Sequence, residues 1–202
     1  MEKNYNISKY KKRALILSYF TVGYNIFEGV VSIIAGILAN SIALEGFGMD
    51  SFIESLSGSI MIWRFKKYGK ISRDEEERVE KRAAKLIAIS FFILAAYILY
   101  ESIRKLYSRE IPDPSIIGLI IVILSIIVMP VLFYLKYRTG VLIKSKSLIA
   151  DSKETLACVL LSFAVLFGIG LNYLYGFWQA DPIAGILIAG YLIKEGFYTL
   201  KE

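Results

Sequence analysis

Six long apolar blocks dominate this 202-residue chain, in which 56% of the residues are hydrophobic. A helix needs about 20 apolar residues to cross the roughly 30 Å core of a bilayer, and each block reaches about that length. Continuous apolar runs of this length predict helices and exclude barrel strands. We therefore predict an all-α integral membrane protein with six transmembrane helices in a single domain, residues 1–202. The predicted spans are residues 14–38, 43–63, 86–106, 115–135, 147–171 and 182–200.

The basic residues lie mostly on one side of these predicted spans. The chain has 24 Lys and Arg residues against 18 Asp and Glu residues, a formal net charge of +6. Most of the basic residues fall in the N-terminal tail, in residues 64–85, in residues 136–146 and near the C-terminus. Loops rich in Lys and Arg stay in the cytoplasm, so we predict that both termini are cytoplasmic. This distribution indicates a protein of the cell membrane, with the lipid bilayer as its surroundings and no nucleic acid as a partner.

Two pairs of ionisable residues interrupt the second and fifth spans. Asp50 and Glu54 form the first pair, and Glu154 and Cys158 form the second, both with i, i+4 spacing. This spacing places the two side chains of a pair on one helix face. Ionisable groups inside a membrane are costly and by default indicate a functional site. Three carboxylates and a potential thiolate from two helices suit a tetrahedral divalent-cation site, so we predict these four residues as metal ligands.

A faint similarity relates the two halves of the chain. Residues 41–44 precede Asp50 at the same offset by which residues 145–148 precede Glu154, with matching Ser and Leu; an alternative register aligns Asp50 with Asp151. The first register makes spans one to three the counterpart of spans four to six. Because each half has an odd number of helices, the halves would form a 3+3 inverted repeat. Both pairs would then reach the middle of the membrane from opposite sides.

The ligand types bear on which ion is bound and how it moves. Three oxygens and one sulfur accept zinc, manganese, iron or cobalt, and the thiolate favours zinc over magnesium or calcium. Crowded carboxylates cannot all stay ionised without a cation, so release of the metal would let them take up protons. The chain has no histidine, so this exchange would run through the site residues themselves. We expect a transported divalent cation rather than a cofactor, with zinc first and manganese, iron, cobalt or cadmium as alternatives.

Other charged residues lie inside the predicted spans. Glu28, Glu45 and Asp151 are further candidates for contact with the ion. Glu45 is about 140° around the helix from Asp50, which indicates another surface or the outer entrance. We expect Lys153 to pair with Glu28 or Asp151 and so to reduce the net charge of the empty site.

An acidic segment, residues 74–80, precedes the third span. Ser72 and Glu75 have the spacing of a capping box, which predicts that this helix begins in water before it enters the membrane. The segment then forms a solvated face of mixed charge. A metal-gathering surface on the cytoplasmic side is the alternative.

Three stretches of the sequence resemble the cation diffusion facilitator family. They are residues 40–54 (NSIALEGFGMDSFIE), residues 147–158 (SLIADSKETLAC) and residues 180–185 (ADPIAG). The resemblance covers nearly the whole chain. It implies six helices, a homodimer, and proton-coupled export of a divalent ion from a site on spans two and five. The chain stops at Glu202, so it resembles a short branch of that family in which the cytoplasmic metal-sensing domain is missing.

The resemblance also bears on the individual ligands. Asp50 and Glu54 fall on the acidic pair of span two in that family. Glu154 stands where the family usually has His or Asp, and Cys158 stands where it usually has Asp. These departures keep the choice of ion open.

We therefore predict a homodimeric divalent-cation transporter, in the first place a zinc exporter driven by proton antiport. The alternatives are a non-transporting membrane protein that binds metal, and a manganese or iron transporter of the same fold. An enzyme is not expected, because the chain lacks histidine and shows no clear Ser/Lys or paired-Asp catalytic motif.

Overall fold

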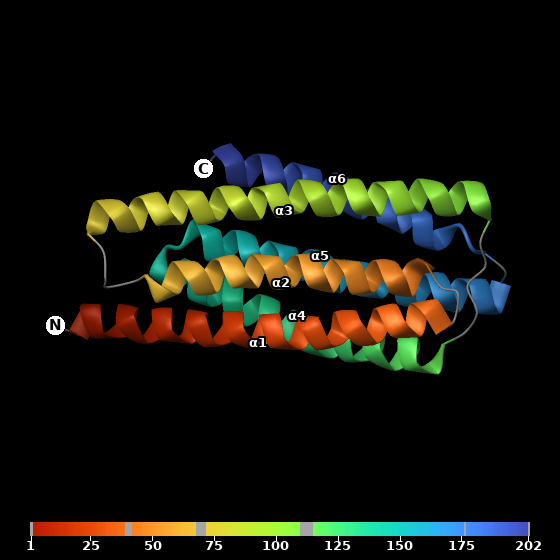
Figure 1. Ribbon diagram of the computed structural model, residues 1–202, viewed down its shortest axis with the longest axis horizontal. Coiled ribbons are helices and arrows are strands. Elements are labelled where there is room, and N and C mark those ends of the chain that lie inside the picture. Colours follow the sequence, from red (N-terminus) through yellow and green to blue (C-terminus); the bar gives the residue numbers. More distant parts are fainter. Residues whose placement is uncertain (1, 39–41, 68–71, 110–114, 176, 202) are drawn as a thin grey trace.

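The predicted six helices are present in the structure. The computed structural model describes residues 2–38, 42–67, 72–109, 115–175 and 177–201. Over these ranges the elements are α1 (Glu2–Leu38), α2 (Ile42–Lys66), α3 (Arg73–Ser108), α4 (Ile116–Ile143), α5 (Lys146–Tyr175) and α6 (Ala180–Lys201). Each predicted span lies within one helix, apart from Ser115, which caps α4. Figure 1 shows the helices lying lengthwise in one elongated bundle.

The start of α3 confirms the predicted capping box. The Glu75 N–H donates to Ser72 Oγ at 3.3 Å, and the Ser72 N–H donates to Glu75 Oε2 at 3.1 Å. These two bonds satisfy N–H groups that a helix start otherwise leaves open. The helix therefore begins in the polar segment, well before its apolar part.

The expectation of a polar loop over residues 136–146 is wrong. Helix α4 continues to Ile143, and α5 begins at Lys146, so only two residues connect them. Lys144 makes the turn with a left-handed φ of 54°, and its N–H donates to the Val141 carbonyl at 3.2 Å. Lys136 is therefore a helical residue, and it is fully buried. A charge that ends an apolar run does not end a helix, which is why the span and the helix differ.

The contacts between helices are largely alike in the two halves of the chain, although α3 also packs on α5. Helix α1 packs mainly on α2, and α4 packs in the same way on α5. The contacts α1–α4, α2–α5 and α3–α6 each join one helix to its counterpart, and α2–α3 matches α5–α6. In Figure 1, α2 and α5 lie in the middle of the bundle, and the start of α1 and the end of α6 lie toward the same end. This pattern fits the predicted relation of two three-helix halves.

Apolar side chains face outward and many polar side chains face inward. Leu38, Ile116 and Leu187 are more than 70% exposed. The buried polar residues include Ser18, Thr21, Asn25, Glu28, Ser32, Asp50, Ser51, Glu54, Ser57, Ser125, Lys136, Asp151, Glu154, Thr155 and Ser162. A soluble protein has the reverse preference, whereas intramembrane ionisable residues turn toward the interior of a bundle. The exterior is therefore suited to lipid.

Within the part of the chain that the structure describes, three stretches are long and apolar enough on their own to cross a membrane: Lys9–Leu38, Glu77–Ser108 and Ile116–Ile143, which belong to α1, α3 and α4. Helices α2 and α5 have 25 and 30 residues, so length does not limit them. The acidic and hydroxyl residues of α2 lower its hydropathy, and Asp50, Ser51 and Glu54 point into the bundle rather than toward lipid.

Glycines allow α1 and α2 to approach closely beside the buried acids. A Cβ on Gly48 would lie 2.8 Å from the Gly29 carbonyl oxygen and 3.0 Å from the Ile33 backbone nitrogen. Neither atom belongs to a flexible side chain, so a larger residue would separate the helices. Small residues commonly serve this purpose between membrane helices.

Gly48→Ala should destabilise the bundle by about 1–3 kcal/mol, because the added methyl group meets backbone atoms. Gly23→Ala is the matched control, since no atom lies within 4 Å of a Cβ there. Alanine is the better helix former, so the control should be neutral or slightly stabilising. Thermal unfolding of the purified proteins in detergent measures both changes. Equal melting temperatures for the two variants would contradict the close approach.

Candidate metal site

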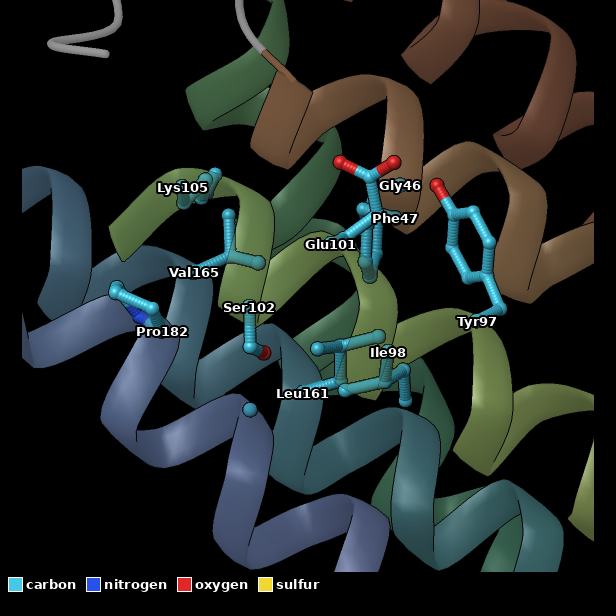
Figure 2. A pocket seen from close by; sticks show the side chains of 11 residues that line it. Gly46, Phe47, Tyr97, Ile98, Glu101, Ser102, Lys105, Leu161, Val165 and Pro182 are labelled. Carbon is cyan, nitrogen blue, oxygen red and sulfur yellow. The ribbon is translucent and has the colours of Figure 1, made fainter. Parts of the chain in front are cut away.

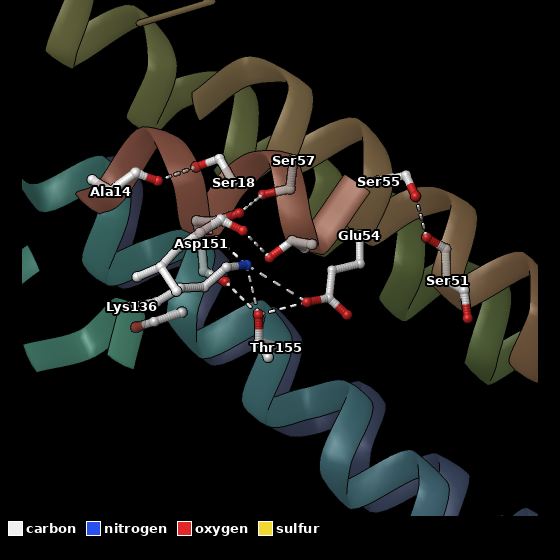
Figure 3. A network of polar contacts seen from close by, with 12 residues as sticks. Ala14, Ser18, Ser51, Glu54, Ser55, Ser57, Lys136, Asp151 and Thr155 are labelled. Atoms are coloured by element: carbon white, nitrogen blue, oxygen red, sulfur yellow. Dashed lines mark hydrogen bonds and ion pairs between the residues drawn. The ribbon is translucent and has the colours of Figure 1, made fainter. Parts of the chain in front are cut away.

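Helices α2 and α5 present their polar residues to each other. Ser57 Oγ donates to Asp151 Oδ1 at 2.8 Å, and Thr155 Oγ1 donates to Glu54 Oε1 at 2.5 Å. Moving toward the C-terminus of α2 therefore corresponds to moving toward the N-terminus of α5, so the two helices are antiparallel. Figure 3 shows these side chains turned toward one another from the two helices. The i, i+4 spacing in the sequence gives each helix one polar face, and the two faces meet.

All four predicted ligands are buried at this contact. Asp50 and Cys158 are 1% exposed, and Glu54 and Glu154 are fully buried. Asp50 and Cys158 come from the facing helices α2 and α5. Among the described residues, no hydrogen-bond partner reaches Asp50 Oδ2, Glu54 Oε2 or either oxygen of Glu154. Three neighbouring acids therefore present buried oxygens that are open to a cation or a proton.

The four residues do not form a closed cage in this structure. Over the described ranges, no three Asp, Glu or Cys side chains are close enough together to hold a metal ion. Of their carboxylates, that of Glu54 lies 3.7 Å from a buried ammonium group. The assignment of these four residues as ligands remains a prediction.

Lys136 of α4 is the residue that sequence reasoning missed. Its Nζ lies 2.9 Å from Asp151 Oδ2 and 3.7 Å from Glu54 Oε1, and it donates to Thr155 Oγ1 at 2.9 Å. Figure 3 shows the Lys136 ammonium group among these three side chains. A helical pattern could have found it, because the buried positions of α4 recur every three or four residues. They include Ser125, Met129, Leu132, Lys136 and Thr139.

The expectation for Lys153 is wrong. Its Nζ lies 2.6 Å from Glu195 Oε2 of α6, and it contacts neither Glu28 nor Asp151 through an ion pair. Lys153 belongs to a different face of α5 from Asp151 and Glu154, so it meets α6 rather than α2. The acidic cluster consists of Asp50, Glu54, Asp151 and Glu154, and its negative charge is therefore reduced by Lys136 rather than by Lys153.

Glu28 of α1 lies at the edge of the cluster. It is fully buried, and its Oε2 accepts a hydrogen bond from Ser51 Oγ at 2.8 Å. Its other oxygen has no hydrogen-bond partner among the described residues. Glu45, by contrast, is only partly buried near the start of α2. The structure thus brings Glu28 and Asp151 to the cluster.

A small cavity of about 50 Å³ lies beside Gly46 and Phe47 in the first turns of α2 (Figure 2). It is bounded by α2, α3, α5 and α6, and its lining includes Gly46, Tyr97, Glu101 and Pro182. Gly46 precedes Asp50 by one helical turn, whereas Glu54 follows Asp50 by one turn. Along α2, the cavity and Lys136 therefore lie on opposite sides of Asp50.

The acidic segment before the third span takes part in local contacts. Glu75 belongs to the capping box, and Glu77 forms an ion pair with Lys81 at 3.9 Å. Both side chains of this pair are more than 70% exposed. These contacts fit the interpretation of a solvated face of mixed charge.

Comparison with known proteins gives this geometry a context. A family model described as the cation efflux transmembrane domain matches residues 18–202. The chain is 25% identical to a cadmium, cobalt and zinc/H(+)-K(+) antiporter of Bacillus velezensis, over 95% of this chain and 61% of that protein. It is 22% identical to transmembrane protein 163 of Xenopus laevis, over 99% of this chain and 70% of that protein. It is 29% identical to an uncharacterized transporter of Methanocaldococcus jannaschii, over 92% of this chain and 66% of that protein.

These relatives are similar along nearly the whole of this chain, and the chain spans about two thirds of their length. The family match covers α2 to α6 and most of α1, including every predicted ligand. The family suggested by the motifs is thereby confirmed. The chain belongs to the cation efflux family of membrane transporters, and residues 18–202 correspond to its transmembrane domain.

Proposed function

We propose that this chain carries a divalent metal cation across a membrane in exchange for protons, with Asp50, Glu54, Glu154 and Cys158 as the ligands. The observation that carries the proposal is the set of buried carboxylate oxygens without hydrogen-bond partners on the facing surfaces of α2 and α5. A buried, unpaired carboxylate is costly unless it is protonated or meets a cation. Two occupants, a metal ion and protons, can each relieve that cost.

Exchange between these occupants is the basis of the proposed coupling. Metal binding requires deprotonated ligands, so an arriving ion displaces protons. When the ion leaves, the crowded acids take protons back, because like charges this close cannot all remain ionised. The metal-loaded and protonated sites have similar net charge. The site can then face either side of the membrane without exposing an unbalanced charge to lipid.

The ligand types support zinc as the first candidate. A thiolate favours zinc or cadmium, while carboxylates also accept manganese, iron and cobalt. The Bacillus velezensis relative is named for cadmium, cobalt and zinc. We propose zinc for this chain, with these other ions as candidates for the same site.

The direction of transport follows from the proposed topology. Basic residues outside the membrane core remain concentrated in the N-terminal tail and in residues 64–85, which supports cytoplasmic termini in the cell membrane. The metal would then leave the cytoplasm as protons enter. We further propose that the working unit is a homodimer, as the family resemblance implies.

Asp50→Asn, Glu54→Gln and Glu154→Gln should each abolish metal flux while the protein still folds, because each change removes a ligand charge but keeps the side-chain shape. Stability should hold or rise as a desolvated charge disappears. The measurement is uptake of Zn²⁺, Cd²⁺, Co²⁺, Fe²⁺ and Mn²⁺ into proteoliposomes. Glu195→Gln is the matched control, since this acid pairs with Lys153 away from the cluster. Normal flux in any two of the three variants would remove the site assignment. Metal binding without flux in the wild type would instead indicate a non-transporting protein.

Cys158→Asp should weaken the preference for zinc and cadmium over manganese, because an oxygen ligand replaces a soft sulfur. Competition among the ions in the same flux assay gives the order of preference before and after the change. An unchanged order would identify Cys158 as a packing residue rather than a ligand.

A proton gradient should drive metal movement in the opposite direction. Proteoliposomes that contain a metal-sensitive dye and a pH-sensitive dye report both fluxes under an imposed gradient of either sign. We expect the direction of net metal flux to reverse when the gradient is reversed. Metal flux that ignores the gradient, with no proton counter-movement, would exclude antiport and favour a uniporter.

A further inference from the structure

Lys136 is a cation placed permanently inside a site proposed to bind cations. Its side chain is fully buried, and its ammonium group lies 2.9 Å from Asp151 Oδ2 and 3.7 Å from Glu54 Oε1. Thr155 bridges it to Glu54, since Thr155 Oγ1 accepts from Lys136 at 2.9 Å and donates to Glu54 at 2.5 Å. Figure 3 shows the ammonium group between Asp151 and Glu54. One of its two carboxylate partners is thus a proposed metal ligand.

We propose that Lys136 is a tethered competitor of the transported ion: it neutralises Glu54 in the empty site and yields that carboxylate when a divalent cation binds. This inference rests on the function proposed above and adds to it a residue that sets the affinity for the ion. Lys136 acts through Glu54 and does not bind the metal.

The two carboxylate contacts of Lys136 differ in a way that supports this role. Asp151 holds the ammonium group directly, and its other oxygen is fixed by the hydrogen bond from Ser57. Glu54 lies farther from Nζ and keeps Oε2 without a hydrogen-bond partner among the described residues. An ion that binds Glu54 would repel the ammonium group, which retains Asp151 as its partner. The lysine therefore has a place to remain after displacement.

A competitor of this kind limits how tightly an ion is held. Three buried carboxylates and a thiolate without a nearby positive charge would bind a divalent cation strongly and release it slowly. An ammonium group a few ångströms from one ligand opposes binding through charge repulsion, which is strong where water is excluded. When the ion departs, the same group returns to Glu54. Lys136 thus favours release and turnover at the expense of affinity.

The test measures ion affinity in the full chain with the lysine charge removed. Lys136→Gln keeps a polar group near Asp151 and Thr155 but has no charge, and it should lower the dissociation constants for Zn²⁺ and Cd²⁺ by about tenfold or more. In proteoliposomes the KM and the maximal rate should both fall. The matched control is Lys153→Met, which removes a charge from the ion pair of α5 with Glu195 and should leave the dissociation constants unchanged.

A second variant tests the proposal even if Lys136→Gln does not fold. Lys136→Gln leaves Asp151 without its cation, and breaking a buried pair can prevent folding. Lys136→Met combined with Asp151→Asn removes both charges together and leaves Glu54 free at unchanged net charge. It should also bind the ions more tightly than the wild type, by a smaller factor. Calorimetric titration of the detergent-solubilised proteins with each metal alone gives the affinities.

The outcomes separate this inference from the proposed function. Tighter binding in a folded Lys136 variant supports competition, because damage to the structure does not raise affinity. Unchanged or weaker binding in the Lys136 variants would make the lysine a structural partner of Asp151. Wild-type binding that Asp50→Asn removes would still uphold the metal site in that case. Binding seen only after Lys136 is changed would support the tethered cation and contradict transport by the wild type. Binding in none of the proteins would overturn both.

Discussion

The exclusion of water from the contact between α2 and α5 is the constraint on which the arrangement of the whole bundle depends. Acids at this contact are enclosed by helices whose outer surfaces suit lipid, so neither water nor lipid can balance their charge. Neighbouring side chains within the bundle balance part of this charge. Asp151 has an ammonium group and a serine hydroxyl, Glu54 has a threonine hydroxyl, and Glu28 has another serine hydroxyl. Among the described residues, oxygens of Asp50, Glu54 and Glu154 keep no hydrogen-bond partner, and the same holds for polar atoms of Tyr24, Asn25 and Ser32 on α1.

Small residues allow the helices to come close enough for this polar contact to form. Many buried hydroxyl groups donate to the carbonyl four residues earlier in their own helix, as Ser18, Thr21, Ser55 and Thr139 do. Such side chains satisfy themselves without holding a neighbouring helix at a distance. The glycine contact between α1 and α2 acts in the same direction. Close helices keep the facing acids in register, so the precision of the site derives from the small residues around it.

The fold could be predicted from the sequence because apolar run length and helix geometry alone determine it. Six helices, their order and the facing of the two polar pairs follow from hydropathy and from the i, i+4 spacing. The predictions became wrong where a charge was taken as a boundary. Lys136 was assigned to a loop because it ends an apolar run, yet the inward-facing stripe of α4 continues through it. Lys153 was expected to pair with Glu28 or Asp151, whereas its position on another face of α5 brings it to Glu195 of α6. Which of two lysines neutralises an acid depends on helix rotation, and hydropathy carries no information about rotation.

The two-residue connection after α4 has a mechanical consequence. It ties α4 and α5 into a stiff hairpin, while the glycine contact binds α1 to α2 as a second unit. Lys136, Asp151, Glu154 and Cys158 all belong to the first unit, and Asp50 and Glu54 belong to the second. Relative motion of the two units would leave the ion pair between Lys136 and Asp151 intact but change the distance from Lys136 to Glu54. The boundary between the two units passes between the predicted ligands of α2 and those of α5. A displacement that separates these ligands therefore also changes how strongly Lys136 neutralises Glu54.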